Sequence, residues 1–154
     1  MNYAAADLHL AIAHHLLIFL LAGIIAFEIG VIRLTMTGAD IHRVGRVDAW
    51  YGILALAIVA VGFSRAIFAA KGWGYYSING FFWAKIAAFA AVGLLSVVPT
   101  VRIISWRRAL AKNAAFAPAG GDILKVILWA EVAFFALIPA CAAAMARGYG
   151  SFAH

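Results

Sequence analysis

The sequence predicts an all-α integral membrane protein in which four transmembrane helices form one bundle. Of the 154 residues, 67% are hydrophobic, and the mean hydropathy is +1.01. Soluble domains have roughly 45–50% apolar residues and about 25% charged residues. Because only 12% of this chain is charged, it cannot build a polar shell around a water-soluble core. We therefore expect residues 1–154 to form a single membrane domain.

Four apolar runs are each long enough to cross the hydrocarbon core as a helix: about residues 8–34, 49–70, 81–106 and 123–145. The first run is longer than the apolar core of a signal peptide, and no positively charged segment precedes it. We expect it to be a retained helix with Asp7 as its N-cap. The connector KGWGYYSING contains aromatic rings that suit the headgroup layer, which predicts an interfacial hairpin.

Basic residues concentrate in two of the three connectors. The first connector carries Arg43 and Arg46, and the third carries Arg107, Arg108 and Lys112, whereas the second holds a single lysine. The positive-inside rule then places the first and third connectors in the cytoplasm. Both termini would lie on the outer side of the membrane, which is the periplasmic side if the membrane is a bacterial inner membrane. The net charge of +6 follows these topology signals and forms no continuous patch, so no nucleic-acid partner is expected.

Side chains with cationic or titratable nitrogen fall at one level in the outer third of the predicted bundle: His14, His15, Arg65 and Lys85. An ionisable group at membrane depth costs at least about 2.5–3.5 kcal/mol and needs a partner, a water pocket or a ligand. One interpretation is that the two long cations extend to the interface along their apolar stems. We expect no carboxylate at this level, so the other interpretation is an anionic guest, with Trp83 and Tyr76 lining the mouth of its pocket.

Helical phase separates the two adjacent histidines. At about 100° per residue, His14 lies about 40° from Glu28 around the helix, and His15 lies about 140° from it. A buried carboxylate should face the bundle interior, which predicts that His14 does so too and that His15 is lateral. The other three runs contain no histidine. We therefore expect no metal site, and for a haem at most one axial histidine, His14 or His15.

Two carboxylates are expected deeper in the bundle, toward the cytoplasmic side. These are Glu28 in the first run and Glu131 in the fourth, with Arg33 and Arg102 nearer the boundary. A structural network of ion pairs is the simpler interpretation. A proton path is the alternative, because acidic groups within membrane helices often carry protons.

Three segments together resemble a known family: GFSRAIFAAKGWGYYSINGFFWAK, LLSVVPTVRIISW and IPACAAAMARG. They look like the bacterial membrane-protein family called domain of unknown function 2214, and the likeness covers nearly the whole chain. This family brings no established activity.

A more distant likeness is to the four-helix protoporphyrinogen oxidase of bacterial haem synthesis. It rests on a histidine early in the first span, followed by Gly23, and on Trp-x-Lys at the start of the third span. The resemblance implies a b-type haem, with functional roles for His14 or His15 and for Lys85. That family continues with a Pro-Arg pair and further histidines, whereas this chain has Glu28 and Gly30 in the region. The likeness therefore implies a porphyrin-sized pocket more than the reaction.

Three functions are compatible with these observations. The first is the binding of a flat, anionic, hydrophobic ligand, haem b or another porphyrin, in the outer basic pocket; whether a redox reaction follows is left open. The second is a small proton-coupled transporter or lipid-headgroup binder that uses Glu28 and Glu131. The third is a non-catalytic membrane subunit, or a homo-oligomer, that packs through small residues such as Ala136, Ala140 and Ala144. We favour the first because of the basic cluster.

Overall fold

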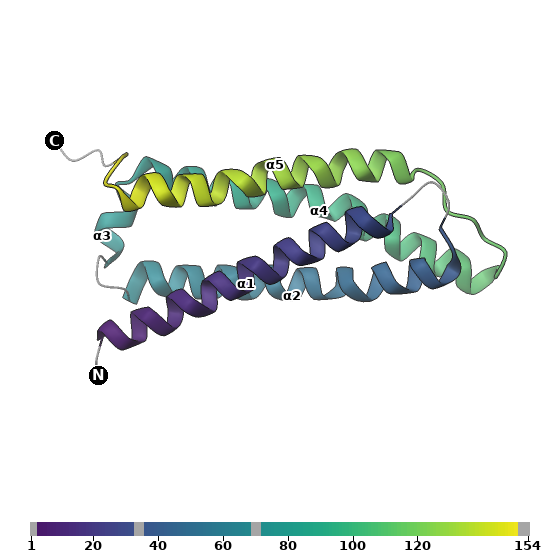
Figure 1. Ribbon diagram of the computed structural model, residues 1–154, viewed down its shortest axis with the longest axis horizontal. Helices are drawn as coiled ribbons and strands as arrows, with labels where there is room; N and C mark the ends of the chain where they lie inside the picture. The colour runs from purple at the N-terminus through teal and green to yellow at the C-terminus, as the bar shows by residue number, and fades with distance from the viewer. Residues whose placement is uncertain (1–2, 33–35, 69–71, 151–154) are drawn as a thin grey trace.

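The computed structural model describes residues 3–32, 36–68 and 72–150, and within them it contains four long helices and one short helix (Figure 1). The helices are α1 (Tyr3–Val31), α2 (Gly38–Phe68), α3 (Gly72–Ser77), α4 (Gly80–Lys112) and α5 (Gly121–Ala146). All but α3 are long and apolar enough to cross a membrane. The prediction of four apolar spanning helices is confirmed.

The long helices form two antiparallel pairs. Most contacts between elements are made by α1 with α2 and by α4 with α5, and α2 packs on α4 to join the pairs. Figure 1 shows that α1 runs obliquely, so that its first turns lie well apart from α5 and its last turns come near it. The start of α1, helix α3 and residues 147–150 lie at one end of the bundle, called here the terminal end. The last turn of α1, the first turn of α2 and the link from α4 to α5 lie at the other, the connector end.

Two helices extend further into the connector end than the apolar runs predicted. Helix α2 begins at Gly38, not near residue 49, because Thr37 and Asp40 cap it reciprocally: Asp40 N donates to Thr37 Oγ1 at 3.2 Å, and Thr37 N donates to Asp40 Oδ2 at 3.0 Å. Helix α4 continues past residue 106 to Lys112. Leu110 packs against the core there, and a Cβ atom on Gly38 would lie 3.3 Å from its Cδ2 atom. A prediction from hydropathy alone makes both helices too short, because these turns are rich in arginine.

The terminal end also differs from the expectation. Helix α1 begins at Tyr3, so Asp7 lies inside the helix and the prediction of an N-cap at Asp7 is wrong. The connector predicted as a hairpin contains the short helix α3. α1 ends at Val31 and α5 covers Gly121–Ala146, close to the predicted runs.

Two apolar clusters fill the interior. The connector-end cluster consists of Ile32, Met36, Ile41, Val44, Ile103, Trp106, Leu124 and Leu128. The central cluster consists of Leu21, Ile25, Tyr51, Ile58 and Val92. Large apolar side chains also cover the outside, as with Leu56 and Leu94, each 74% exposed. Such an exterior is suited to lipid contact.

The start of α4 is held by Asn79, which is completely buried. Its Oδ1 accepts hydrogen bonds from the backbone N–H groups of Phe81 at 3.0 Å and Phe82 at 3.3 Å, which caps the helix. Its Nδ2 donates to the carbonyl of Tyr149 at 3.1 Å, and Gly80 N donates to the carbonyl of Gly150 at 2.8 Å. The turn after α5 is thereby fixed to the start of α4.

Candidate functional site

A cavity of about 750 Å³ lies in the terminal half of the bundle, where α1 and α5 diverge. Its walls come from α1, α2, α3, α4 and α5, and they are mainly apolar, with Phe19, Phe135 and Ile138 among the lining residues. Of the predicted site residues, five line this cavity: His14, His15, Arg65, Tyr76 and Lys85. The volume lies within the roughly 300–1,000 Å³ that is usual for small-molecule pockets.

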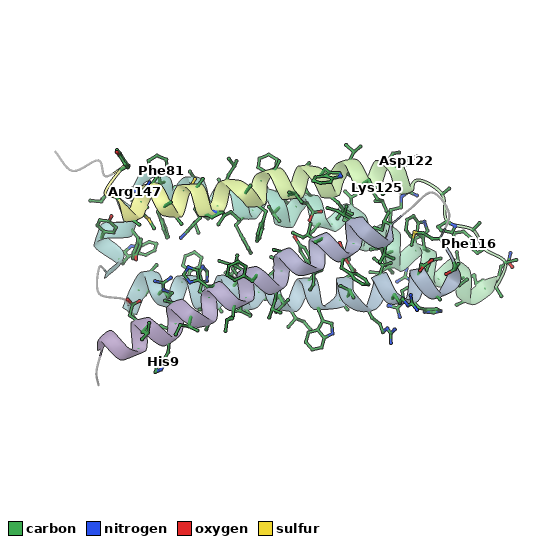
Figure 2. All side chains as sticks on the ribbon, viewed as in Figure 1. His9, Phe81, Phe116, Asp122, Lys125 and Arg147 are labelled. Carbon is green, nitrogen blue, oxygen red and sulfur yellow. The ribbon has the colours of Figure 1, made fainter. Side chains whose placement is uncertain are left out.

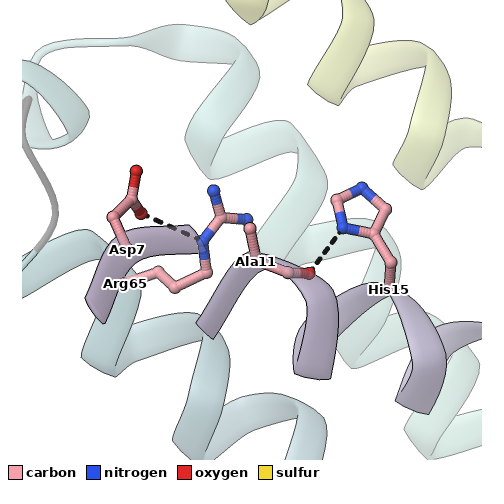
Figure 3. Close-up of polar contacts among 4 residues, drawn as sticks. All are labelled: Asp7, Ala11, His15 and Arg65. Atoms are coloured by element: carbon pink, nitrogen blue, oxygen red, sulfur yellow. Dashed lines mark hydrogen bonds and ion pairs between the residues drawn. The ribbon is translucent and has the colours of Figure 1, made fainter. Parts of the chain in front are cut away.

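The two cations have different neighbours. The Nε atom of Arg65 lies 3.6 Å from Asp7 Oδ1, an ion pair between α2 and α1 (Figure 3). The expectation that no carboxylate reaches this level is therefore wrong. Lys85 forms no such pair within the described residues; its Nζ lies 5.4 Å from the centre of the Phe82 ring, within reach of a cation–π contact. The positive charge that the cavity offers to a ligand thus comes chiefly from Lys85.

The two histidines lie on the wall formed by α1. His14 packs against Gly62 of α2: a Cβ atom on that glycine would lie 3.2 Å from His14 Cε1. The Nδ1 atom of His14 is buried and has no hydrogen-bond partner among the described residues. His15 is more exposed, and its Nδ1 lies 2.7 Å from the carbonyl oxygen of Ala11 on the same helix (Figure 3). Both histidines therefore line the cavity, and His14 is the one packed between α1 and α2.

His9 gives a contrast on the same helix. It is exposed and does not line the cavity (Figure 2). Within the part of the chain that the structure describes, no three His, Cys, Asp or Glu side chains are grouped as the ligands of a metal ion would be.

The aromatic residues predicted at the mouth lie in different places. Tyr76, on α3, lines the cavity and packs against Phe82, with ring centres 5.5 Å apart. Trp83 is half exposed and is not a lining residue; its Nε1 donates to the carbonyl of Ser77 at 3.0 Å. Phe82, its neighbour in sequence, lines the cavity instead. Sequence reasoning also missed Asp7 and Gly62, whose proximity to the site depends on how α1 pairs with α2.

Glu28 and Glu131 lie outside the cavity and are almost completely buried, at 1% and 0% exposure. Neither forms an ion pair within the described residues, and Arg102 is exposed to the surroundings of the bundle. Arg33, the other predicted partner, lies outside the described residues. The structure places a third carboxylate, Asp48, near Glu28. The predicted second run, residues 49–70, begins just after Asp48 and therefore leaves this residue outside the membrane span.

Comparison with known families gives a match that covers residues 6–150. The matching model is described as a predicted membrane protein of domain of unknown function 2214. No curated protein and no solved structure matches the chain. The likeness to protoporphyrinogen oxidase finds no support in these comparisons. The match covers nearly the whole chain and agrees with the four apolar helices, and this multi-pass membrane protein belongs to the family of domain of unknown function 2214.

Proposed function

We propose that the cavity binds a flat, hydrophobic anion, and that a porphyrin, haem b in particular, is the candidate ligand. The observation that carries this proposal is the combination of size, apolar walls and the cation Lys85 in one cavity of about 750 Å³. A hydrophobic ring system would occupy the apolar volume. The carboxylates of such a ligand would pair with the ammonium group, which otherwise lies beside the Phe82 ring without an anion among the described residues.

The pair formed by Asp7 and Arg65 would orient the ligand more than attract it. Their side chains are 32% and 28% exposed, and the carboxylate offsets most of the guanidinium charge. The remaining N–H groups of Arg65 can still donate to a ligand carboxylate, since the ion pair engages its Nε atom. Lys85 and Arg65 would in this way contact two acidic groups at the polar edge of the ligand.

His14 fits a haem better than His15 does, because it is packed between α1 and α2 whereas His15 is more exposed. The Nδ1 atom of His14 is buried, so Nε2 is the ring nitrogen that would ligate iron in the cavity. His15 keeps the same capacity, since the contact of its Nδ1 with the Ala11 carbonyl leaves its Nε2 free. Because adjacent histidines point apart on a helix, one histidine of α1 would hold the iron, and a bound haem would supply one-electron chemistry.

We propose that the terminal end faces the outside of a bacterial inner membrane. Four of the exposed basic residues at the connector end are Arg43, Arg46, Arg108 and Lys112. The positive-inside rule places such a surface in the cytoplasm, which leaves the cavity near the outer leaflet. Cysteine accessibility in intact cells tests this: a cysteine at Lys112 should react with a membrane-impermeant reagent only after lysis.

The proposal predicts that purified protein in detergent binds added haem with a Soret band that depends on His14. We expect His14→Ala to shift or remove this band, because the axial nitrogen is lost. The matched control is His9→Ala on the same helix, which should leave the spectrum unchanged because His9 is exposed outside the cavity. A wild-type protein that gives no Soret shift, or equal spectra for the two variants, contradicts the haem assignment.

A second prediction separates charge recognition from ligation. Lys85→Met should weaken the binding of both haem and metal-free protoporphyrin by about tenfold or more, since a hydrogen bond to a charged group contributes about 1.5–3 kcal/mol. His14→Ala should weaken haem binding selectively. Lys112→Met is the control, because this lysine is exposed at the other end of α4. Fluorescence quenching of the intrinsic tryptophans gives both affinities. Unchanged affinities in Lys85→Met would place the anion elsewhere.

A further inference from the structure

Three carboxylates from three helices gather in the interior, away from the ligand cavity. Glu28 of α1, Asp48 of α2 and Glu131 of α5 are 1%, 8% and 0% exposed. Glu28 lies close enough to interact electrostatically with each of the other two. Along α1, Glu28 lies six residues, about 9 Å of helix, beyond Ala22, which lines the cavity. None of the three carboxylates lines the cavity, and their charge is opposite in sign to that of Lys85.

The three carboxylates differ in the number of polar groups that they contact. Asp48 accepts a hydrogen bond from Thr100 Oγ1 at 2.7 Å and also interacts with the guanidinium group of Arg107 on α4. Glu131 Oε2 accepts a long hydrogen bond of 3.4 Å from the Tyr51 hydroxyl. The Oε1 atoms of Glu28 and Glu131 are buried without any hydrogen-bond partner among the described residues. Asp48 therefore has a cation and a short hydrogen bond that stabilise its ionised form. Among the described residues, neither glutamate has a cation as partner, and Glu131 has the long hydrogen bond from Tyr51.

The charged and titratable groups that face this region come from each packed helix. They are Glu28 from α1, Asp48 and Tyr51 from α2, Arg107 from α4 and Glu131 from α5. The cation in this set interacts with Asp48. An ionised carboxylate buried without a counter-charge is unstable and instead takes up a proton, and two adjacent ones repel each other. At least one of the glutamates must be neutralised.

We propose that Glu28 and Glu131 form a proton-binding site in the middle of the bundle, with at least one of the two carboxyl groups protonated at neutral pH. Protonation removes the charge of a carboxyl group that is buried without a counter-charge, and the protonated group can donate a hydrogen bond that its ionised form cannot. This proposal does not depend on the proposed function of the cavity, and it applies whether or not a porphyrin binds there.

The apolar clusters on either side shield this site from water. Along α1, Glu28 follows Ile25 of the central cluster by three residues and precedes Ile32 of the connector-end cluster by four. Along α5, Glu131 lies three residues after Leu128 of the connector-end cluster. A proton placed between two dry layers exchanges only when one of them opens. Intramembrane carboxylates in proton-coupled carriers work in this setting.

Infrared spectroscopy decides whether the proton is present. The purified protein at neutral pH should show the carbonyl stretch of protonated carboxylic acid, and this band should be reduced or shifted in Glu28→Gln and in Glu131→Gln. Asp122→Asn is the matched control, because Asp122 is exposed in the first turn of α5 (Figure 2). A spectrum without any band that responds to either glutamine variant overturns the proposal.

Labelling with a hydrophobic carbodiimide then identifies the carboxyl group that is protonated. It also distinguishes a bound proton from a bound metal cation. Dicyclohexylcarbodiimide adds to protonated carboxyl groups from the lipid phase, and mass spectrometry of the labelled protein should locate the adduct on Glu28 or Glu131, with less labelling as the pH rises. Sodium or lithium ions at constant pH should not protect. Protection by either ion would show that the occupant is a metal cation, and labelling of Asp122 alone would also contradict the proposal.

Discussion

Gly62→Leu is expected to weaken haem binding at least 100-fold, about 2.7 kcal/mol, while the helical content stays unchanged. A Cβ at this position would already lie 3.2 Å from His14 Cε1, so even a methyl group requires the imidazole to shift. Gly62 lines the cavity, and the rest of a leucine side chain would extend into the space that the ligand needs. The measurement is a Soret titration in detergent, with circular dichroism to verify the helices.

Gly52→Leu on the same helix is the matched control. A Cβ at Gly52 meets no atom within 4 Å, and the residue is exposed on the outside of the bundle. Both variants replace a mid-helix glycine of α2 by a stronger helix former, so they share any gain in helix propensity. If Gly62→Leu bound haem as tightly as Gly52→Leu, the ligand would have to lie outside this cavity and the proposed function would fail.

Asn79→Ala is expected to destabilise the protein by about 2 kcal/mol, at the upper end of the range for a lost N-cap. The substitution removes the acceptor for two backbone N–H groups of α4 and the donor to the Tyr149 carbonyl, in a site without solvent access. The thermal unfolding midpoint in detergent should fall. Proteolysis in the segment after α5 should become faster, because one of its two backbone attachments is lost.

Asn79→Ser separates the two roles of this side chain. Serine keeps a cap acceptor but is too short to replace the amide that donates to Tyr149, so it should recover most of the stability and leave proteolysis fast. Asn113→Ala, at the exposed C-terminal end of the same helix, should change stability by less than about 0.5 kcal/mol. If Asn79→Ala lost no more stability than Asn113→Ala, the buried cap would contribute no more than the exposed residue.

The helical architecture could be predicted because hydropathy over some twenty residues reports directly on burial in lipid. The start of α2 and the end of α4 could not be predicted in this way. Their arginine-rich turns lower the hydropathy, although capping and packing keep these turns helical. The Thr37–Asp40 capping pair was the signal that would have moved the start of α2. With that start, Asp48 would have been placed inside the bundle.

The candidate site was predictable only in the residues that are unusual in a membrane helix. Lys85, Arg65 and His14 stand out against apolar neighbours, and all three line the cavity. Asp7 was missed because its partner lies 58 positions along the chain, and pairing of α1 with α2 cannot be read from either segment alone. Trp83 and Phe82 differ by one helical step of about 100°, which decides which ring faces inward.

The division of the bundle into two antiparallel pairs has a mechanical consequence. His14 and Arg65 belong to the α1–α2 pair, whereas Lys85 and Pro139 belong to the α4–α5 pair. The side chains that would contact a ligand therefore come from both helix pairs. A rigid-body rotation of one helix pair relative to the other would widen or narrow the cavity without breaking a hydrogen bond within any helix.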